Sequence, residues 1–145
     1  QGAPEPGTRR ALRRLAPVSG LESVMLRIYD TSLDVVRAAQ PLLSAIGRSD
    51  PDLEPQLRRA VTSVPLNIAE GSYSRGRNRN ARYATATGSM REVLAGLDVA
   101  ELLGYVTVPL ELRDRIDLDE TYVHTTARGE KFAIEDLSHS NLIIS

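Results

Sequence analysis

The stretch of sequence that decides the fold is Ser63-Val64-Pro65-Leu66-Asn67-Ile68-Ala69-Glu70-Gly71, near the middle of a chain of 145 residues. Val64 and Ile68 are one helical turn apart and continue an apolar series with a spacing of three and four residues. Pro65 interrupts the series without shifting its phase, so we expect a helix that bends at Pro65 and continues. Gly71 is expected to end the helix in a left-handed conformation.

Upstream of this stretch, Ser49-Asp50-Pro51 is a helix-start signal, so the central helix should begin just after it. An earlier helix is expected over residues 21–46, because apolar residues recur there with helical period. Pro41 predicts a kink or an early end near Gln40, and Gly47 should stop this helix.

Downstream, residues 72–80 are polar and rich in arginine, without an apolar period, so we expect a loop or a frayed helix start. A third helix should follow, with apolar positions from Tyr83 to Ala100 and an end at Gly104. A fourth helix is expected from Val108 to Ile116. The apolar period decays after Asp117, which predicts a short or atypical last helix.

The composition agrees with helices packed on helices. Hydrophobic residues make up 41% of the chain but aromatic residues only 4%, without Trp, so the core must consist mainly of Leu, Val, Ile and Ala. The absence of Cys excludes disulfides, thiolate metal sites and a Cys nucleophile. The length is that of one domain, and neither a membrane span nor a signal peptide is recognisable, so we expect a cytoplasmic protein.

The net charge of −1 hides an uneven distribution of charge. Residues 1–100 hold 14 Arg and 10 acidic residues, whereas residues 101–145 hold 3 Arg, 1 Lys and 9 acidic residues. Arginine outnumbers lysine 17 to 1, and the planar guanidinium group is well suited to forked contacts with phosphate. We therefore expect a basic arm over residues 1–20 and an acidic segment over residues 117–145.

The central stretch, together with several motifs around it, resembles the four-helix-bundle proteins encoded in intervening sequences of large-subunit ribosomal RNA genes. That family in turn resembles the accessory variability proteins of diversity-generating retroelements. The further motifs are Leu26-Arg27-Ile28-Tyr29, Gln56-Leu57-Arg58-Arg59-Ala60, Arg82-Tyr83, Ser89-Met90-Arg91-Glu92 and Leu102-Leu103-Gly104-Tyr105. The resemblance covers roughly residues 21–116.

This resemblance implies an all-α fold, an antiparallel up-down four-helix bundle over residues 21–116, commonly assembled as a homopentamer. It also implies a nucleic-acid-binding role, with RNA favoured over DNA. Residues 117–145 depart from the pattern of the family and are treated as a divergent acidic segment.

The arginine-rich stretch is the main candidate binding site. Clustered guanidinium groups neutralise phosphates and release counterions, and tyrosine rings can stack on unpaired bases. The alternative interpretation is a solvated loop between helices. The candidate residues are Tyr73, Arg75, Arg77, Arg79 and Arg82, with Tyr83 as a second flanking ring.

Arg58 and Arg59 are added as candidate phosphate contacts, with the alternative that one of them pairs with Glu70 or Glu92 across the bundle. Asn67 and Glu70 share a helix face and are interpreted as structural groups. They should satisfy backbone and Arg groups freed at Pro65. Glu70→Ala is then expected to destabilise the fold or the assembly.

Nothing in the sequence identifies a reacting group, so we expect neither an enzyme nor a cofactor. Only His124 and His139 are present, and their spacing from acidic residues matches no metal motif. The leading hypothesis is a non-catalytic, oligomeric RNA-binding protein. The alternative is a scaffold or accessory subunit that docks a partner such as a reverse transcriptase, by a charged face or by the divergent tail.

Overall fold

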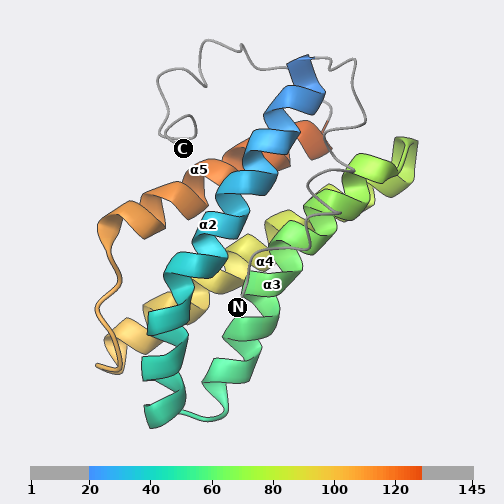
Figure 1. The fold of residues 1–145 in the computed structure, drawn as a ribbon. Coiled ribbons are helices and arrows are strands. Elements are labelled where there is room, and N and C mark those ends of the chain that lie inside the picture. The colour runs from blue at the N-terminus through green and yellow to red at the C-terminus, as the bar shows by residue number, and fades with distance from the viewer. Residues whose placement is uncertain (1–19, 129–145) are drawn as a thin grey trace.

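The computed structural model describes residues 20–128, with side chains from residue 24 onward. Within these residues the chain forms four helices: α2 (Gly20–Ser49), α3 (Leu53–Tyr73), α4 (Gly76–Leu102) and α5 (Leu110–Ala127) (Figure 1). No strand occurs in this part of the chain, so the predicted all-α class is confirmed for it. The predictions for residues 1–19 and 129–145, which include most of the basic arm and His139, lie outside the described residues.

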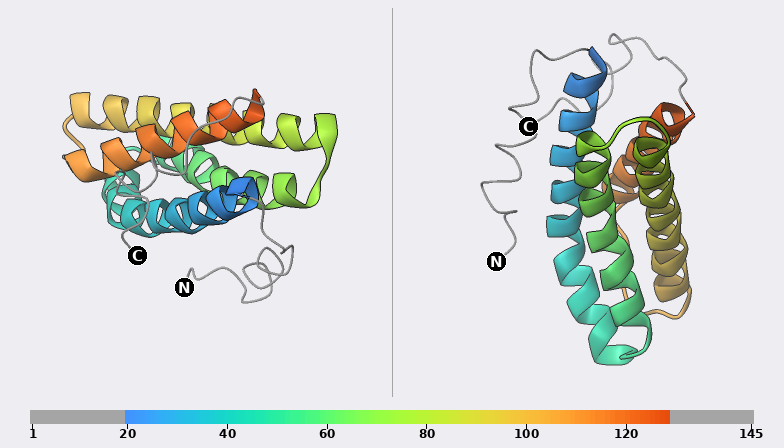
Figure 2. Two further views of the ribbon diagram at one scale, coloured as in Figure 1. Left: turned by 90° about the horizontal axis from the view of Figure 1, so that it is seen from above. Right: turned by 90° about the vertical axis from the view of Figure 1, so that its right-hand side faces the viewer.

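Each helix packs against two others: α2 contacts α3 and α5, and α4 contacts the same two helices. Figure 2 shows α3 and α4 side by side, joined at one end by a short turn. These contacts are consistent with a bundle around one central core.

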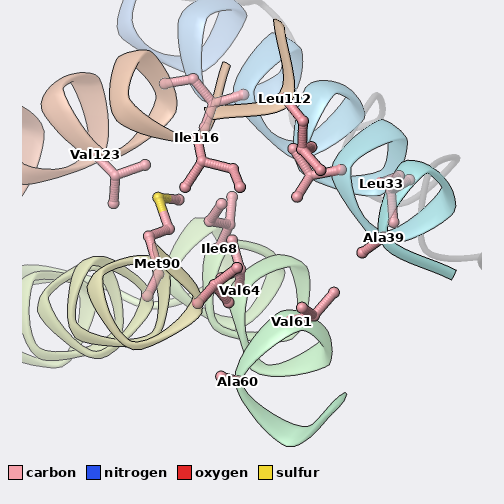
Figure 3. Packing of buried hydrophobic residues seen from close by; sticks show 14 of the residues in the cluster. Leu33, Ala39, Ala60, Val61, Val64, Ile68, Met90, Leu112, Ile116 and Val123 are labelled. Carbon is pink, nitrogen blue, oxygen red and sulfur yellow. The ribbon is translucent and has the colours of Figure 1, made fainter. Parts of the chain in front are cut away.

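The core is formed by the predicted apolar stripes. Figure 3 shows Ile68 of α3 and Met90 of α4 facing Ile116 and Val123 of α5. Other aliphatic side chains that are almost completely buried come from three helices: Ile28, Leu43 and Ile46 of α2, Leu57 of α3, and Val93 and Leu97 of α4. The stripes predicted for the first three helices are therefore confirmed, because their members face this shared core.

Helix α2 continues through Pro41, so the early end expected near Gln40 is wrong. Pro41 is exposed to solvent, where water can satisfy the carbonyl that the missing N–H leaves free. Gly47 does not stop the helix either. The backbone N–H of Asp50 donates to the carbonyl of Ile46 at 2.7 Å, which closes the last turn beyond the glycine.

The predicted start of the central helix is confirmed, since α3 begins at Leu53. Asp50 caps it: its Oδ1 accepts from the backbone N–H of Leu53 at 2.9 Å and of Asp52 at 3.1 Å. The bond from Leu53 holds the pKa of Asp50 below its ordinary value. Tyr105, after α4, donates its hydroxyl to Asp50 Oδ2 at 3.2 Å, which ties the two connections at this end of the molecule together.

Helix α3 continues through Pro65 and also through Gly71, where the sequence predicts its end. Pro65 is inside the helix and buried, as expected from the preserved apolar phase. Gly71 is also inside the helix, which ends at Tyr73, so the prediction of a left-handed Gly71 is wrong. Among the described residues, positive φ values occur only at Gly76 (56°) and Gly104 (78°).

Helix α5 extends to Ala127, so the expected short fourth helix is also wrong. The stripe that begins with Leu112 and Ile116 continues beyond Asp117. Its later buried members are Asp119, Tyr122, Val123 and Thr126. Polar residues occupy two of these positions, which hides the apolar period in the sequence. No helix in the described part of the chain is long and apolar enough to cross a bilayer.

Candidate nucleic-acid interface

The arginine-rich stretch is not a loop: it forms the junction of α3 and α4. Only Ser74 and Arg75 lie between the two helices, and α4 begins at Gly76. We call residues 73–82 the hairpin tip; Figure 1 shows this junction in green. Arginine is a good helix former, and the exposed first turns of α4 need no apolar stripe, so the polar sequence is compatible with a helix.

The turn is closed by hydrogen bonds to backbone carbonyls. The backbone N–H of Ser74 donates to the carbonyl of Gly71 at 3.1 Å, and the Ser74 hydroxyl donates to that of Glu70 at 2.9 Å. Arg79 Nε donates to the Ser74 carbonyl at 3.0 Å, so this guanidinium group is half-buried against the turn. Arg79 therefore stabilises the hairpin tip and does not extend into solvent.

The other arginines of the hairpin tip are exposed, but they differ in their partners. Arg82 Nη1 lies 3.0 Å from Glu70 Oε2, in an ion pair about half exposed on both sides. Arg75 and Arg77 make no side-chain hydrogen bond or ion pair with any residue between 24 and 128. Residues 71–91 contain no acidic residue, so the hairpin tip keeps a net positive charge.

Tyr73 in the hairpin tip and Tyr83, the residue that follows the tip, have different roles. Tyr73 is 51% exposed, so its ring is accessible to a ligand. Tyr83 is buried, and its ring packs against Gly71. A Cβ atom on Gly71 would lie 2.7 Å from Tyr83 Cδ1, so only glycine allows this approach of α3 to α4. Tyr83 is therefore a packing residue.

The hairpin tip also carries a surface hollow of about 330 Å³. Its lining residues recur on one face of α4, with Ser74 at the edge: Ser74, Asn78, Ala81, Arg82 and Thr85. The Asn78 side chain makes no hydrogen bond to the rest of the described chain, whereas the Thr85 hydroxyl donates to the carbonyl of Ala81 at 2.9 Å. The amide of Asn78 is therefore free to donate and to accept.

The motif around Pro65 is mainly structural. Asn67 Nδ2 donates to the Ser63 carbonyl at 2.8 Å and to Ser63 Oγ at 2.9 Å. The hydroxyl of Ser89 on α4 donates to the same Ser63 Oγ at 2.8 Å. These bonds join α3 to α4 at a half-buried position, so Asn67 is involved in helix pairing.

Glu70 does not have the environment that was expected for it. Its side chain is 56% exposed, and its partner is Arg82 on the next helix. Glu70 is not a buried carboxylate because the end of α3 projects one face into solvent. An exposed ion pair of this kind contributes about 0–1 kcal/mol to stability.

Arg58 and Arg59 lie far from the hairpin tip. Arg58 is separated from Arg75 by 17 residues, which is about 25 Å at 1.5 Å per helical residue. Arg58 Nε donates to Glu54 Oε1 at 2.6 Å within the same helix, not to Glu70 or Glu92. Arg59 is exposed without a partner in the described part of the chain. The structure does not bring these two residues to the other candidates.

Asp119 is a notable residue that the sequence did not single out as buried. It is 2% exposed, and Thr31 Oγ1 of α2 lies 2.9 and 3.0 Å from its two carboxylate oxygens. Burial raises its pKa from 3.8 to about 7, against the lowering effects of Thr31 and Arg115. The spacing 112, 116, 119, 123, 126 could have placed it in the core. Within residues 20–128 no group of His, Cys, Asp and Glu side chains is arranged to hold a metal ion.

One comparison with known proteins identifies a family. The model of the 23S rRNA-intervening sequence protein family matches residues 25–117, which cover α3, α4, most of α2 and the start of α5. Neither a curated protein nor a solved structure gives a significant match.

Proposed function

The chain belongs to the 23S rRNA-intervening sequence protein family, and on that premise we propose that it is a non-catalytic protein that binds RNA, rather than DNA, through the hairpin tip. The observation that carries the proposal is the pair of exposed guanidinium groups of Arg75 and Arg77, which have no partner among residues 24–128 and lie in a region without acidic residues. Such groups release counterions when they contact phosphates, which supplies affinity without base recognition.

We also propose that the helices follow the antiparallel up-down order and that the chain assembles with copies of itself, as a pentamer. The short connections between α2, α3 and α4 favour this order of helices. Exposed apolar side chains at the end of α4 favour association: Val99, Leu102 and Leu103 are 45%, 86% and 56% exposed. In a ring, each copy would add its own basic tip to a common field.

The RNA proposal is tested by salt titration of binding, measured by fluorescence anisotropy with a labelled single-stranded RNA. Each phosphate contact on single-stranded nucleic acid contributes about 0.7 to the slope of log K against log salt. The double variant Arg75→Ala, Arg77→Ala is expected to weaken binding and to reduce the slope by about 1.4 for each bound tip. Arg48→Ala is the charge-matched control, because Arg48 is an exposed arginine in the last turn of α2, away from the hairpin tip.

A protein-docking role, as an accessory subunit for a partner such as the reverse transcriptase of a diversity-generating retroelement, is the second candidate. The exposed apolar end of α4 favours it, because such surfaces bind other proteins. Light scattering coupled to size exclusion separates the two functions. The second candidate would be supported by a chain that is a monomer, whose mass does not change when RNA is added, and that forms a complex with a protein partner through Leu102.

A further inference from the structure

The hairpin tip combines features that a phosphate-binding surface alone does not need. Arg75 and Arg77 supply charge, but Tyr73 adds an exposed ring, and the hollow, which is lined from the following residue Ser74 onward, adds a concave surface with neutral polar groups. The hollow, at about 330 Å³, is at the lower end of the range for small-molecule sites, about 300–1,000 Å³. A duplex backbone could contact the arginines without using either feature.

The chemistry of the hollow matches the edge of a nucleobase. Base edges carry donors and acceptors side by side, and the free amide of Asn78 offers one of each. The Thr85 hydroxyl keeps its lone pairs as acceptors, because its proton is donated to the Ala81 carbonyl. Arg82, which also lines the hollow, is partly neutralised by Glu70, so this pocket is less cationic than the rest of the tip.

A base inside a duplex cannot enter the hollow. In an A-form helix the bases are stacked, side chains cannot reach into the deep, narrow major groove, and the shallow minor groove exposes base edges without releasing a base from its stack. The hollow lies on the outer face of a helix, so only a base that has left its stack can enter it. Aromatic side chains such as Tyr73 then hold neighbouring unpaired bases by stacking.

We propose, on the basis of the RNA-binding function proposed above, that the hairpin tip recognises single-stranded RNA by seating one unpaired base in the hollow lined by Asn78, Ala81 and Thr85, with Tyr73 stacking on a neighbouring base. Arg75 and Arg77 hold the flanking phosphates. The ligand class is thus unpaired RNA, such as a loop, bulge or end.

The test compares two probes on the full chain: a short labelled single-stranded RNA, and the blunt duplex that this strand forms with its complement. The single strand is expected to bind at least about tenfold more tightly, because only it can use both stacking and the hollow. Tyr73→Leu should weaken single-strand binding by roughly 5- to 150-fold, the range for the loss of one stacking partner, whereas Tyr73→Phe should preserve it.

A second pair of variants tests the hollow itself. Ala81→Leu fills the hollow without a change of charge, whereas Ala84→Leu adds the same side chain to an exposed position of α4 that does not line it. We expect only Ala81→Leu to weaken single-strand binding, with the salt slope unchanged. Equal binding of single strand and duplex, or wild-type binding by Ala81→Leu, would overturn the base site but leave the phosphate-binding tip. If neither RNA binds at low salt, the proposed function itself is refuted.

Discussion

Asp119 offers the most quantitative test of the packing described above. Its carboxyl group lies between α2 and α5, beside a small space of about 10 Å³. The side chains that α3 and α4 contribute to this space, Val61, Val64, Met90 and Val93, carry no charge. The charged groups that act on it are Arg115 and Asp34. Asp119→Asn removes the titration at nearly constant volume.

The hydrogen bonds around Asp119 fit the protonated form. Thr31 Oγ1 lies within 3.0 Å of both carboxylate oxygens and of the Ile28 carbonyl, yet a hydroxyl has only one proton. A protonated Asp119 can donate to Thr31 while Thr31 donates to Ile28. An ionised Asp119 must share the single Thr31 proton with that carbonyl, which makes the charged form costly in the core.

The contribution of Asp119 to the free energy of unfolding follows from its pKa values in the unfolded and folded states. Each pH unit between the ordinary pKa of 3.8 and the folded-state pKa of about 7 corresponds to about 1.4 kcal/mol, so the full difference is about 4 kcal/mol. Because the folded protein binds the proton more tightly, this stabilisation is complete below about pH 4 and is lost as the pH rises through 7. Between about pH 5.5 and 7.5 the free energy of unfolding should fall by about 2 kcal/mol.

The assay is urea unfolding of the wild type and of Asp119→Asn at a series of pH values. The difference between the two proteins cancels the pH dependence of every other group, because the two sequences share all of them. We expect the wild type to lose about 2 kcal/mol relative to the variant across this range. Parallel pH profiles for the two proteins, or a wild type that gains stability as the pH rises, would refute a buried, protonated Asp119.

Three further predictions concern the contacts between α3 and α4. Gly71→Ala should destabilise the protein by about 1–3 kcal/mol through the clash with Tyr83. Gly88→Ala, with open space around its Cβ, should stabilise it by roughly 0.5–1 kcal/mol. Equal melting temperatures of the two variants would contradict the packing of Gly71 against Tyr83. Ser63→Ala should cost about 1–3 kcal/mol, because Ser89 and Asn67 lose their shared acceptor. Thr62→Ala is its exposed control, and a similar urea midpoint for both would argue against the network. Glu70→Gln should change stability by less than about 1 kcal/mol but raise RNA affinity roughly threefold by releasing Arg82; weaker binding would exclude competition between Glu70 and phosphate.

The helices could be predicted where apolar residues alone carry the period. The stripes through Ile28, Val64 and Val93 consist mainly of apolar side chains, and these three residues are buried. The prediction failed in α5, where Asp119 and Thr126 occupy core positions and interrupt the apolar pattern. Their burial depends on contacts between helices, such as the bond from Thr31, which single-sequence periodicity does not contain.

Glycine and proline were misinterpreted for a related reason. The sequence favours a helix stop at Gly71. In the structure, the lack of a side chain at Gly71 makes room for the ring of Tyr83, twelve residues later. Pro41 is tolerated because it lies on the exposed face of α2, and its orientation becomes evident only when the core is known. Local propensity was therefore overridden by packing at these positions.

The candidate site was predicted as a set of residues but not as a geometry. The sequence predicts one role for all arginines near the tip. The structure separates Arg75 and Arg77, which have no partner in the described part of the chain, from Arg79 and Arg82, which bind Ser74 and Glu70. It also excludes Tyr83 as a stacking ring, because that side chain is buried. Hydrogen bonds across a turn and between helices decide these differences.

Contact between RNA and the hairpin tip is tested most directly by hydrogen–deuterium exchange measured with and without a single-stranded RNA. We expect increased protection of backbone amides around residues 73–85 in the presence of RNA, with little change in the connection of α2 and α3 near Asp50. Protection confined to the Asp50 connection or to the end of α4 around Leu102, with none at the hairpin tip, would contradict it.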